Sequence, residues 1–169
     1  MAESLAFTRT ASRQQIYAEI APQIEALIAG EADLVANLAN IAAVLREALG
    51  FFWVGFYLFK DGQLVLGPFQ GPIACTRIDP GKGVCGHSFT ADKTVIVPNV
   101  DEFPGHIACA TASRSEIVVP IHAADGNVSG VLDVDSDKLD DFTETDANGL
   151  GEIVKLLERS IAAAPTGGR

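Results

Sequence analysis

Residues 51–66 read FFWVGFYLFKDGQLVL, and this stretch decides the fold. Its first part, from Phe51 to Phe59, is rich in aromatic residues, which favour β-strands. The pair Asp61-Gly62 is a signal for a tight turn, and Gln63 to Leu66 returns as a second strand. The stretch therefore predicts a β-hairpin.

Two helices are predicted upstream of this hairpin. Ser12 is a plausible N-cap for the first, although Pro22 predicts a break or kink inside it. Gly50 is a natural stop for the second. Apolar residues recur at helical spacing in both. The first stripe is Ile16, Ile20, Ile24, Leu27 and Ile28; the second is Leu34, Leu38, Ile41, Leu45 and Leu49.

Downstream of the hairpin, the pattern predicts further strands and a closing helix. The expected strands are 72–78, 94–97, and a hairpin of 116–122 with 128–134; the expected helices are 84–91 (helix or turn) and 144–161. Residues 98–114 lack clean periodicity and read as a long loop or short helix, a kind of segment that is often functional. Two helices, mostly antiparallel strands and a helix predict one α+β domain with a central, mostly antiparallel sheet and helices on one face.

Length and charge exclude several classes of protein. The chain has 169 residues, the size of one domain, with 12 basic and 22 acidic residues and a net charge of −10. An acidic protein is repelled by phosphate, which argues against nucleic acid or an anionic membrane as a partner. No apolar run reaches the ~18 residues needed to span a bilayer, and no signal peptide stands out. We expect a cytoplasmic protein.

Three cysteines, Cys75, Cys85 and Cys109, carry the first chemical signal. None forms a C-x-x-C pair, and each lies in or beside a loop-like stretch of small or polar residues. One interpretation is three small buried hydrophobic residues. The other is thiol redox chemistry, in which one thiolate attacks and a second resolves the product.

Histidines and glycines give weaker signals. His87, His106 and His122 lack metal-ligand spacing, so no metal site is predicted, although His87 and His106 lie near cysteines and could tune a thiolate. Residues 81–86 match G-x-G-x-x-G formally. Without a strand turning directly into a helix, the match indicates only a tight entry into a helix.

Acidic and aromatic residues mark three of the expected strands. Glu116 heads an apolar strand, and Asp133 and Asp135 alternate, which places both on one face. That face either lines a pocket, where the acids could bind an ammonium group or donate a proton, or is solvated. Trp53 and Tyr57 share a face of their strand, either as core or as the wall of an aromatic pocket.

These motifs together resemble one family, the free methionine-(R)-sulfoxide reductases, which are single GAF domains. The matching segments are 52–57, 71–75, 81–86, the Cys109 loop running into 113–120, and 132–136. The resemblance spans nearly the whole chain. It implies a GAF-type domain over 12–162, with 1–11 and 163–169 as flexible termini, and a homodimer.

The resemblance also implies a thiol mechanism. Cys109 would be the catalytic nucleophile that attacks the sulfoxide sulfur, Cys75 the main resolving cysteine, and Cys85 an auxiliary one. The Cys109 sulfenic acid would form an intramolecular disulfide, and an external dithiol such as thioredoxin would reduce it. No cofactor is expected.

The remaining implied roles concern the substrate, free L-methionine (R)-sulfoxide. Glu116, Asp133 and Asp135 would hold it and protonate its oxygen, while Trp53 and Tyr57 would line the site around its methyl-sulfur end. Two alternatives without turnover remain open: a GAF domain that senses a small molecule, and a thiol redox switch.

Overall fold

The computed structural model describes residues 4–106 and 112–163. Within them, no helix is both long and apolar enough to cross a membrane. The helices are α1 (Arg13–Ile28), α2 (Leu34–Leu49), α3 (Gly83–Ala91), the 3₁₀ turn η1 (Val100–Glu102) and α4 (Glu144–Ala163). The strands are β1 (Trp53–Lys60), β2 (Gln63–Gln70), β3 (Arg77–Ile78), β4 (Val95–Val97), β5 (Ser115–His122) and β6 (Val128–Ser136).

The strands form one sheet in the order β3-β2-β1-β6-β5-β4, and all neighbours are antiparallel. Both predicted hairpins are confirmed, β1 with β2 and β5 with β6, although β2 continues to Gln70, beyond the predicted end. Strands β1, β6 and β5 lie at the centre of the sheet, which gives them a buried face on each side.

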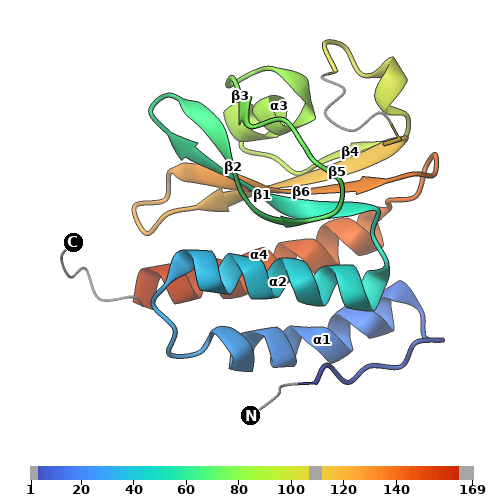
Figure 1. Cartoon of the computed structure of the whole chain (residues 1–169), viewed down its shortest axis with the longest axis vertical. Helices are drawn as coiled ribbons and strands as arrows, with labels where there is room; N and C mark the ends of the chain where they lie inside the picture. Colours follow the sequence, from blue (N-terminus) through green and yellow to red (C-terminus); the bar gives the residue numbers. More distant parts are fainter. Residues whose placement is uncertain (1–3, 107–111, 164–169) are drawn as a thin grey trace.

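Helices cover one face of this sheet (Figure 1). α2 and α4 pack on the strands, and α1 packs on α2 and α4. The predicted apolar stripes of α1 and α2, apart from Leu27, belong to the larger core, in which Ile20, Ile24, Leu38, Ile41 and Leu45 have no exposed surface. The predicted α+β architecture is confirmed.

Of the break or kink predicted at Pro22, the break does not occur, because α1 runs through the proline from its N-cap Ser12. Pro22 and Ala18, whose carbonyl loses its helical partner, both lie on the exposed side of the helix. Water can hydrate that carbonyl, while the buried stripe keeps the helix on the core.

The predicted flexible N-terminus concerns residues only partly described. Leu5 and Phe7 pack against the larger core, and the backbone amides of Ala6 and Thr8 donate to side chains of α1. Residues 1–3 and 164–169 lie outside the described part, so the domain bounds stay a prediction.

The opposite face of the sheet carries a second, smaller core beneath α3 and the loops around it (Figure 1). Its buried members are Trp53, Tyr57, Leu64, Ile78, Val84, Cys85, Val97, Val100, Val118 and Val131. The segment predicted as helix or turn is helical from Gly83, and the predicted fourth strand is β4. The long segment 98–114 contains η1, and its residues 107–111 lie outside the described part.

The strand predicted over 72–78 is wrong except for its last two residues, which form β3. Two side chains of β1 hold the preceding loop on the sheet face. Trp53 Nε1 donates to the carbonyl of Pro72 at 3.0 Å, and the Tyr57 hydroxyl donates to the carbonyl of Cys75 at 2.9 Å. These hydrogen bonds draw the loop across the sheet face instead of alongside β2.

Gly86→Ala is expected to lower the free energy of unfolding by about 1–3 kcal/mol. A Cβ at Gly86 would lie 2.5 Å from the carbonyl oxygen of Asp79 and 2.9 Å from the amide nitrogen of Gly81, so backbone would have to move. Denaturant unfolding measures the loss. The matched control is Gly151→Ala in α4, where nothing lies within 4 Å and alanine should stabilise the helix. Equal stability of both variants would contradict the close approach.

The side chain of His122 connects β5, in which it lies, to α4 and to the C-terminal end of α3. Its Nδ1 lies 2.8 Å from a carboxylate oxygen of Glu158 in α4, and its Nε2 lies 2.7 Å from one of Asp92, the C-cap of α3. Both carboxylates raise the pKa of His122 above 6.5, with Glu158 the larger cause. The ion pairs therefore stabilise the fold fully below pH 6.5, and this contribution is lost as pH rises through the raised pKa.

His122→Gln is therefore expected to destabilise the protein more at pH 6 than at pH 9. Unfolding free energies of wild type and variant at both pH values give the comparison. His87→Gln, a change at an exposed histidine of α3, is the control and should show no such difference. A pH-independent loss at His122 would show that the ring packs without its charge mattering.

Candidate active site

The strand register brings the predicted acidic and aromatic residues to one face of the sheet. Asp135 of β6 pairs with Trp53 of β1 on one side and with Glu116 of β5 on the other. Asp133 and Tyr57, two and four positions along their strands, share this face. It is the face covered by α3, so the predicted sharing of a face is confirmed for both pairs.

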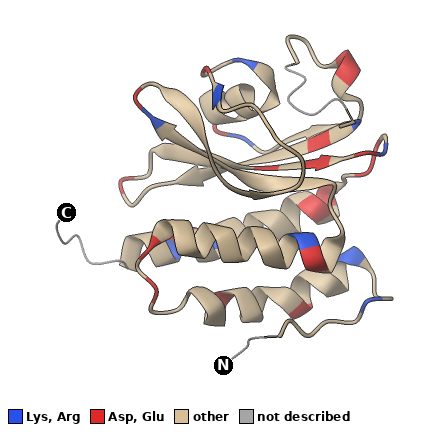
Figure 2. Ribbon diagram, viewed as in Figure 1, with Lys and Arg blue, Asp and Glu red and all other residues tan. Residues whose placement is uncertain are grey.

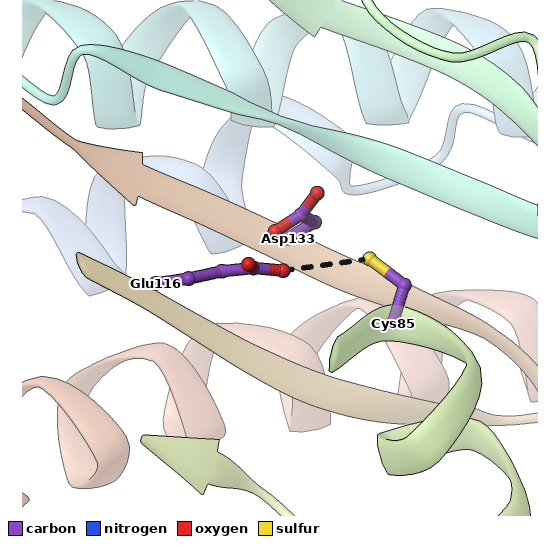
Figure 3. A group of neighbouring side chains, drawn as sticks. All are labelled: Cys85, Glu116 and Asp133. Carbon is purple, nitrogen blue, oxygen red and sulfur yellow. Dashed lines mark hydrogen bonds between the residues drawn. The ribbon is translucent and has the colours of Figure 1, made fainter. Parts of the chain in front are cut away.

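α3 adds a thiol to two of these acids (Figure 3). One ligand-capable atom each from Cys85, Glu116 and Asp133 lies within 4.8 Å of the other two, and Cys85 Sγ lies 3.9 Å from Glu116 Oε1. All three residues are buried, at 3%, 6% and 6% exposure. We call this group the thiol–carboxyl cluster.

Burial and mutual repulsion dominate the electrostatics of the cluster. Burial, followed by neighbouring carboxylates, raises the pKa values of Cys85 and Glu116 well above their ordinary range. Burial and Asp135 raise the pKa of Asp133 in the same way. Asp135, which is more accessible, has its pKa raised by burial to about 6. The site thus favours the protonated forms of Glu116 and Asp133 beside an Asp135 that ionises more readily.

Positive charge is scarce around these acids. Figure 2 shows acidic segments in β5 and β6, inside the molecule between the helical layer and α3. Among the ion pairs of the described residues, the one that reaches the cluster joins His106 Nε2 to Glu116 Oε2 at 4.0 Å. Burial lowers the pKa of His106, which keeps it mostly neutral.

Two buried polar atoms have no hydrogen-bond partner within the described residues, Asp133 Oδ1 and Ser113 Oγ. A buried acceptor without a partner costs free energy, so such atoms indicate a place for a ligand group. Sequence reasoning assigned no role to Ser113. The only signal for Ser113 was its position in segment 113–120, one of the segments that resemble the family.

Aromatic rings line the site beside the acids. Trp53 stacks on Tyr57 with centroids 6.2 Å apart and on Phe69 with centroids 5.4 Å apart. Gly71 permits this packing, since a Cβ there would lie 2.5 Å from the Trp53 ring and its φ is +141°. The rings pack in the smaller core and also anchor the loop that carries Cys75.

The structure places the cysteines unequally. Cys85 belongs to the cluster, and Cys75 lies partly buried in the loop held by Tyr57. Cys109, the predicted nucleophile, lies outside the described residues. His87 is exposed, with its ring edge-on to Phe103.

Comparison with known proteins agrees with the fold. Residues 31–162 match the family model of the GAF domain. GAF domain-containing protein A of Dictyostelium discoideum is 55% identical over 94% of this chain and 99% of its own length. Free methionine-R-sulfoxide reductase of Escherichia coli is 45% identical over 89% of this chain and 92% of its own.

A solved structure is also similar to this chain in fold and in sequence. Free methionine-R-sulfoxide reductase of Neisseria meningitidis, in complex with its substrate, superimposes with a TM-score of 0.92 at 54% identity, covering 95% of this chain and 96% of that one. The chain therefore belongs to the GAF-domain family, in the group that contains the free methionine-R-sulfoxide reductases.

Proposed function

We propose that this protein reduces free L-methionine (R)-sulfoxide to L-methionine with its own cysteines as the source of electrons. One observation carries the proposal: buried carboxyl groups with raised pKa values lie beside stacked aromatic rings on the sheet face that α3 covers, and α3 brings a thiol to them. A sulfoxide needs its oxygen protonated to become electrophilic at sulfur, and its methyl group needs an apolar wall. The reductases of E. coli and N. meningitidis support the choice of substrate.

The carboxyl groups have different roles, proton donation or ammonium binding, because their environments differ. Glu116 and Asp133, whose pKa values are raised well above the ordinary range, supply the proton to the sulfoxide oxygen. Asp135 is ionised above pH ~6 and holds the substrate ammonium group. Trp53 and Tyr57 contact the methyl-sulfur end.

Cysteine chemistry completes the turnover. The Cys109 thiolate attacks the substrate sulfur, oxygen passes to Cys109 as sulfenic acid, and methionine leaves. The Cys75 thiol then condenses with the sulfenic acid, giving a disulfide and one water. A dithiol of the thioredoxin class returns both thiols by exchange. Cys85 serves as an auxiliary thiol.

The proposal also includes the cofactor requirement, the oligomeric state and the location of the protein. No cofactor besides the external dithiol is required by these steps, because the two electrons come from thiols. A homodimer and a cytoplasmic location also remain predictions from the sequence.

Racemic free methionine sulfoxide, turned over with excess dithiol and then separated on a chiral column, tests the function. We expect only the R epimer to disappear, and Cys109→Ser to be inactive. Survival of both epimers with folded wild-type protein would overturn the proposal in favour of a small-molecule sensor. Disulfide formation by peroxide but not by the sulfoxide would instead indicate a redox switch.

A further inference from the structure

We propose that the thiol–carboxyl cluster is also a binding site for Zn²⁺, which enters in place of the substrate and blocks turnover. The proposal adds a regulatory ligand to the site of the proposed function and rests on that function only for the inhibition. Binding itself follows from the cluster alone.

The donor set suits zinc better than other common divalent cations. Cys85 offers a thiolate and Glu116 and Asp133 offer carboxylate oxygens, a mixture of sulfur and oxygen that Zn²⁺ accepts. Mg²⁺ and Ca²⁺ take oxygen ligands and are not expected to use the thiol. Three protein donors and one position open to water is the usual arrangement of an accessible zinc site.

The spacing of the donors is close to that of a bound ion. Bonds of about 2.0–2.3 Å in a tetrahedron place donor atoms about 3.3–3.8 Å apart. The three donor atoms lie within 4.8 Å of one another, and the thiol and Glu116 are already at 3.9 Å. The donor atoms would have to close by about 1.5 Å or less to reach this spacing, which is within reach of side-chain rotation.

A second observation points to a ligand at the cluster. Asp133 Oδ1 is buried and has no hydrogen-bond partner among residues 4–106 and 112–163. In this part of the chain the one basic side chain paired with the cluster is His106, whose Nε2 lies 4.0 Å from Glu116, and burial lowers its pKa. Three acidic groups from α3, β5 and β6 therefore face one another with little positive charge between them.

Inhibition follows from shared atoms. The substrate needs Glu116 and Asp133 as proton donors, whereas zinc needs them, and Cys85, deprotonated as ligands, with their protons released to solvent. Substrate and zinc therefore exclude each other. The sequence did not predict this site because Cys85 and Glu116 lie 31 positions apart.

The test is equilibrium binding of Cd²⁺ to the reduced full-length protein, followed through the thiolate-to-cadmium ultraviolet absorption, with competition by Zn²⁺. We expect one Cd²⁺ per chain, displaced by Zn²⁺ and not by Mg²⁺. Cys85→Ser should abolish the absorption, and Glu116→Gln should weaken binding by more than about 100-fold. Both are near-isosteric, and circular dichroism checks that they fold. Asp125→Asn, at the exposed β5–β6 turn, should bind like wild type.

The outcomes separate this proposal from the proposed function. Wild-type turnover of the R epimer without Cd²⁺ binding would overturn the zinc site alone, while binding without turnover would leave the site and overturn the reductase. An absorption that persists in Cys85→Ser and vanishes in Cys75→Ser would place the metal on another thiol and overturn the assignment. Free methionine (R)-sulfoxide should lower the apparent Cd²⁺ affinity of Cys109→Ser, which does not turn the sulfoxide over, in proportion to its concentration. Unchanged affinity would overturn the mutual exclusion.

Discussion

Glu116→Gln is expected to lower kcat/KM for free methionine (R)-sulfoxide by about 10²–10⁴-fold, the usual contribution of a general acid. Glutamine preserves the shape of this buried side chain, but its amide is far too weak an acid to protonate a sulfoxide oxygen. Burial and the neighbouring carboxylates raise the pKa of Glu116 well above its ordinary value, which favours the protonated acid that the variant lacks. Steady-state kinetics with excess dithiol measures the effect.

The matched control makes the same chemical change outside the site. Glu102→Gln lies in η1, where the side chain is exposed and hydrogen-bonded to Asn99. It should leave kcat/KM within about twofold, as expected for a surface change. If Glu116→Gln keeps full activity while Asp133→Asn loses it, Asp133 is the acid. If both variants stay active, the proposed protonation is wrong.

How much of this site could be predicted depends on the range of the contacts. Alternation along a strand is local, so Asp133 with Asp135, and Trp53 with Tyr57, could be assigned to common faces from the sequence. The thiol–carboxyl cluster could not, because it depends on how α3 docks over β5 and β6. Cys85 sits on a short helix whose placement no local pattern encodes.

The continuous helix at Pro22 and the strand wrongly predicted over 72–76 have a related cause. Pro22 disfavours a helix locally, yet the buried stripe on both sides of it outweighs that cost. Residues 72–76 resemble a strand locally, yet hydrogen bonds from Trp53 and Tyr57 hold this loop across the sheet. In both cases a tertiary contact overrides a local preference, and in the second case that contact belongs to the candidate site.

Asp146→Ala is expected to lower the free energy of unfolding by about 3–5 kcal/mol. Asp146 is fully buried at the start of α4, where it pairs with Arg13 at 3.2 Å. It also accepts hydrogen bonds from the Tyr17 hydroxyl at 3.0 Å and from the amide of Thr143 at 2.9 Å. Alanine leaves the last two donors without this acceptor, and each loss costs about 1–3 kcal/mol.

Arg13 itself retains a partner in this variant, because Asp141 lies 3.0 Å from its guanidinium. The loss should therefore come mainly from the tie between α1 and α4, and Asp146→Asn, which keeps an acceptor for Tyr17, should cost about half as much. Urea unfolding measures both, with Glu152→Ala in the same helix as control. Its exposed pair with Lys155 predicts a change within about 0.5 kcal/mol. A loss below about 1 kcal/mol for Asp146→Ala would show that the apolar packing of α1, not this buried pair, holds the helical layer together.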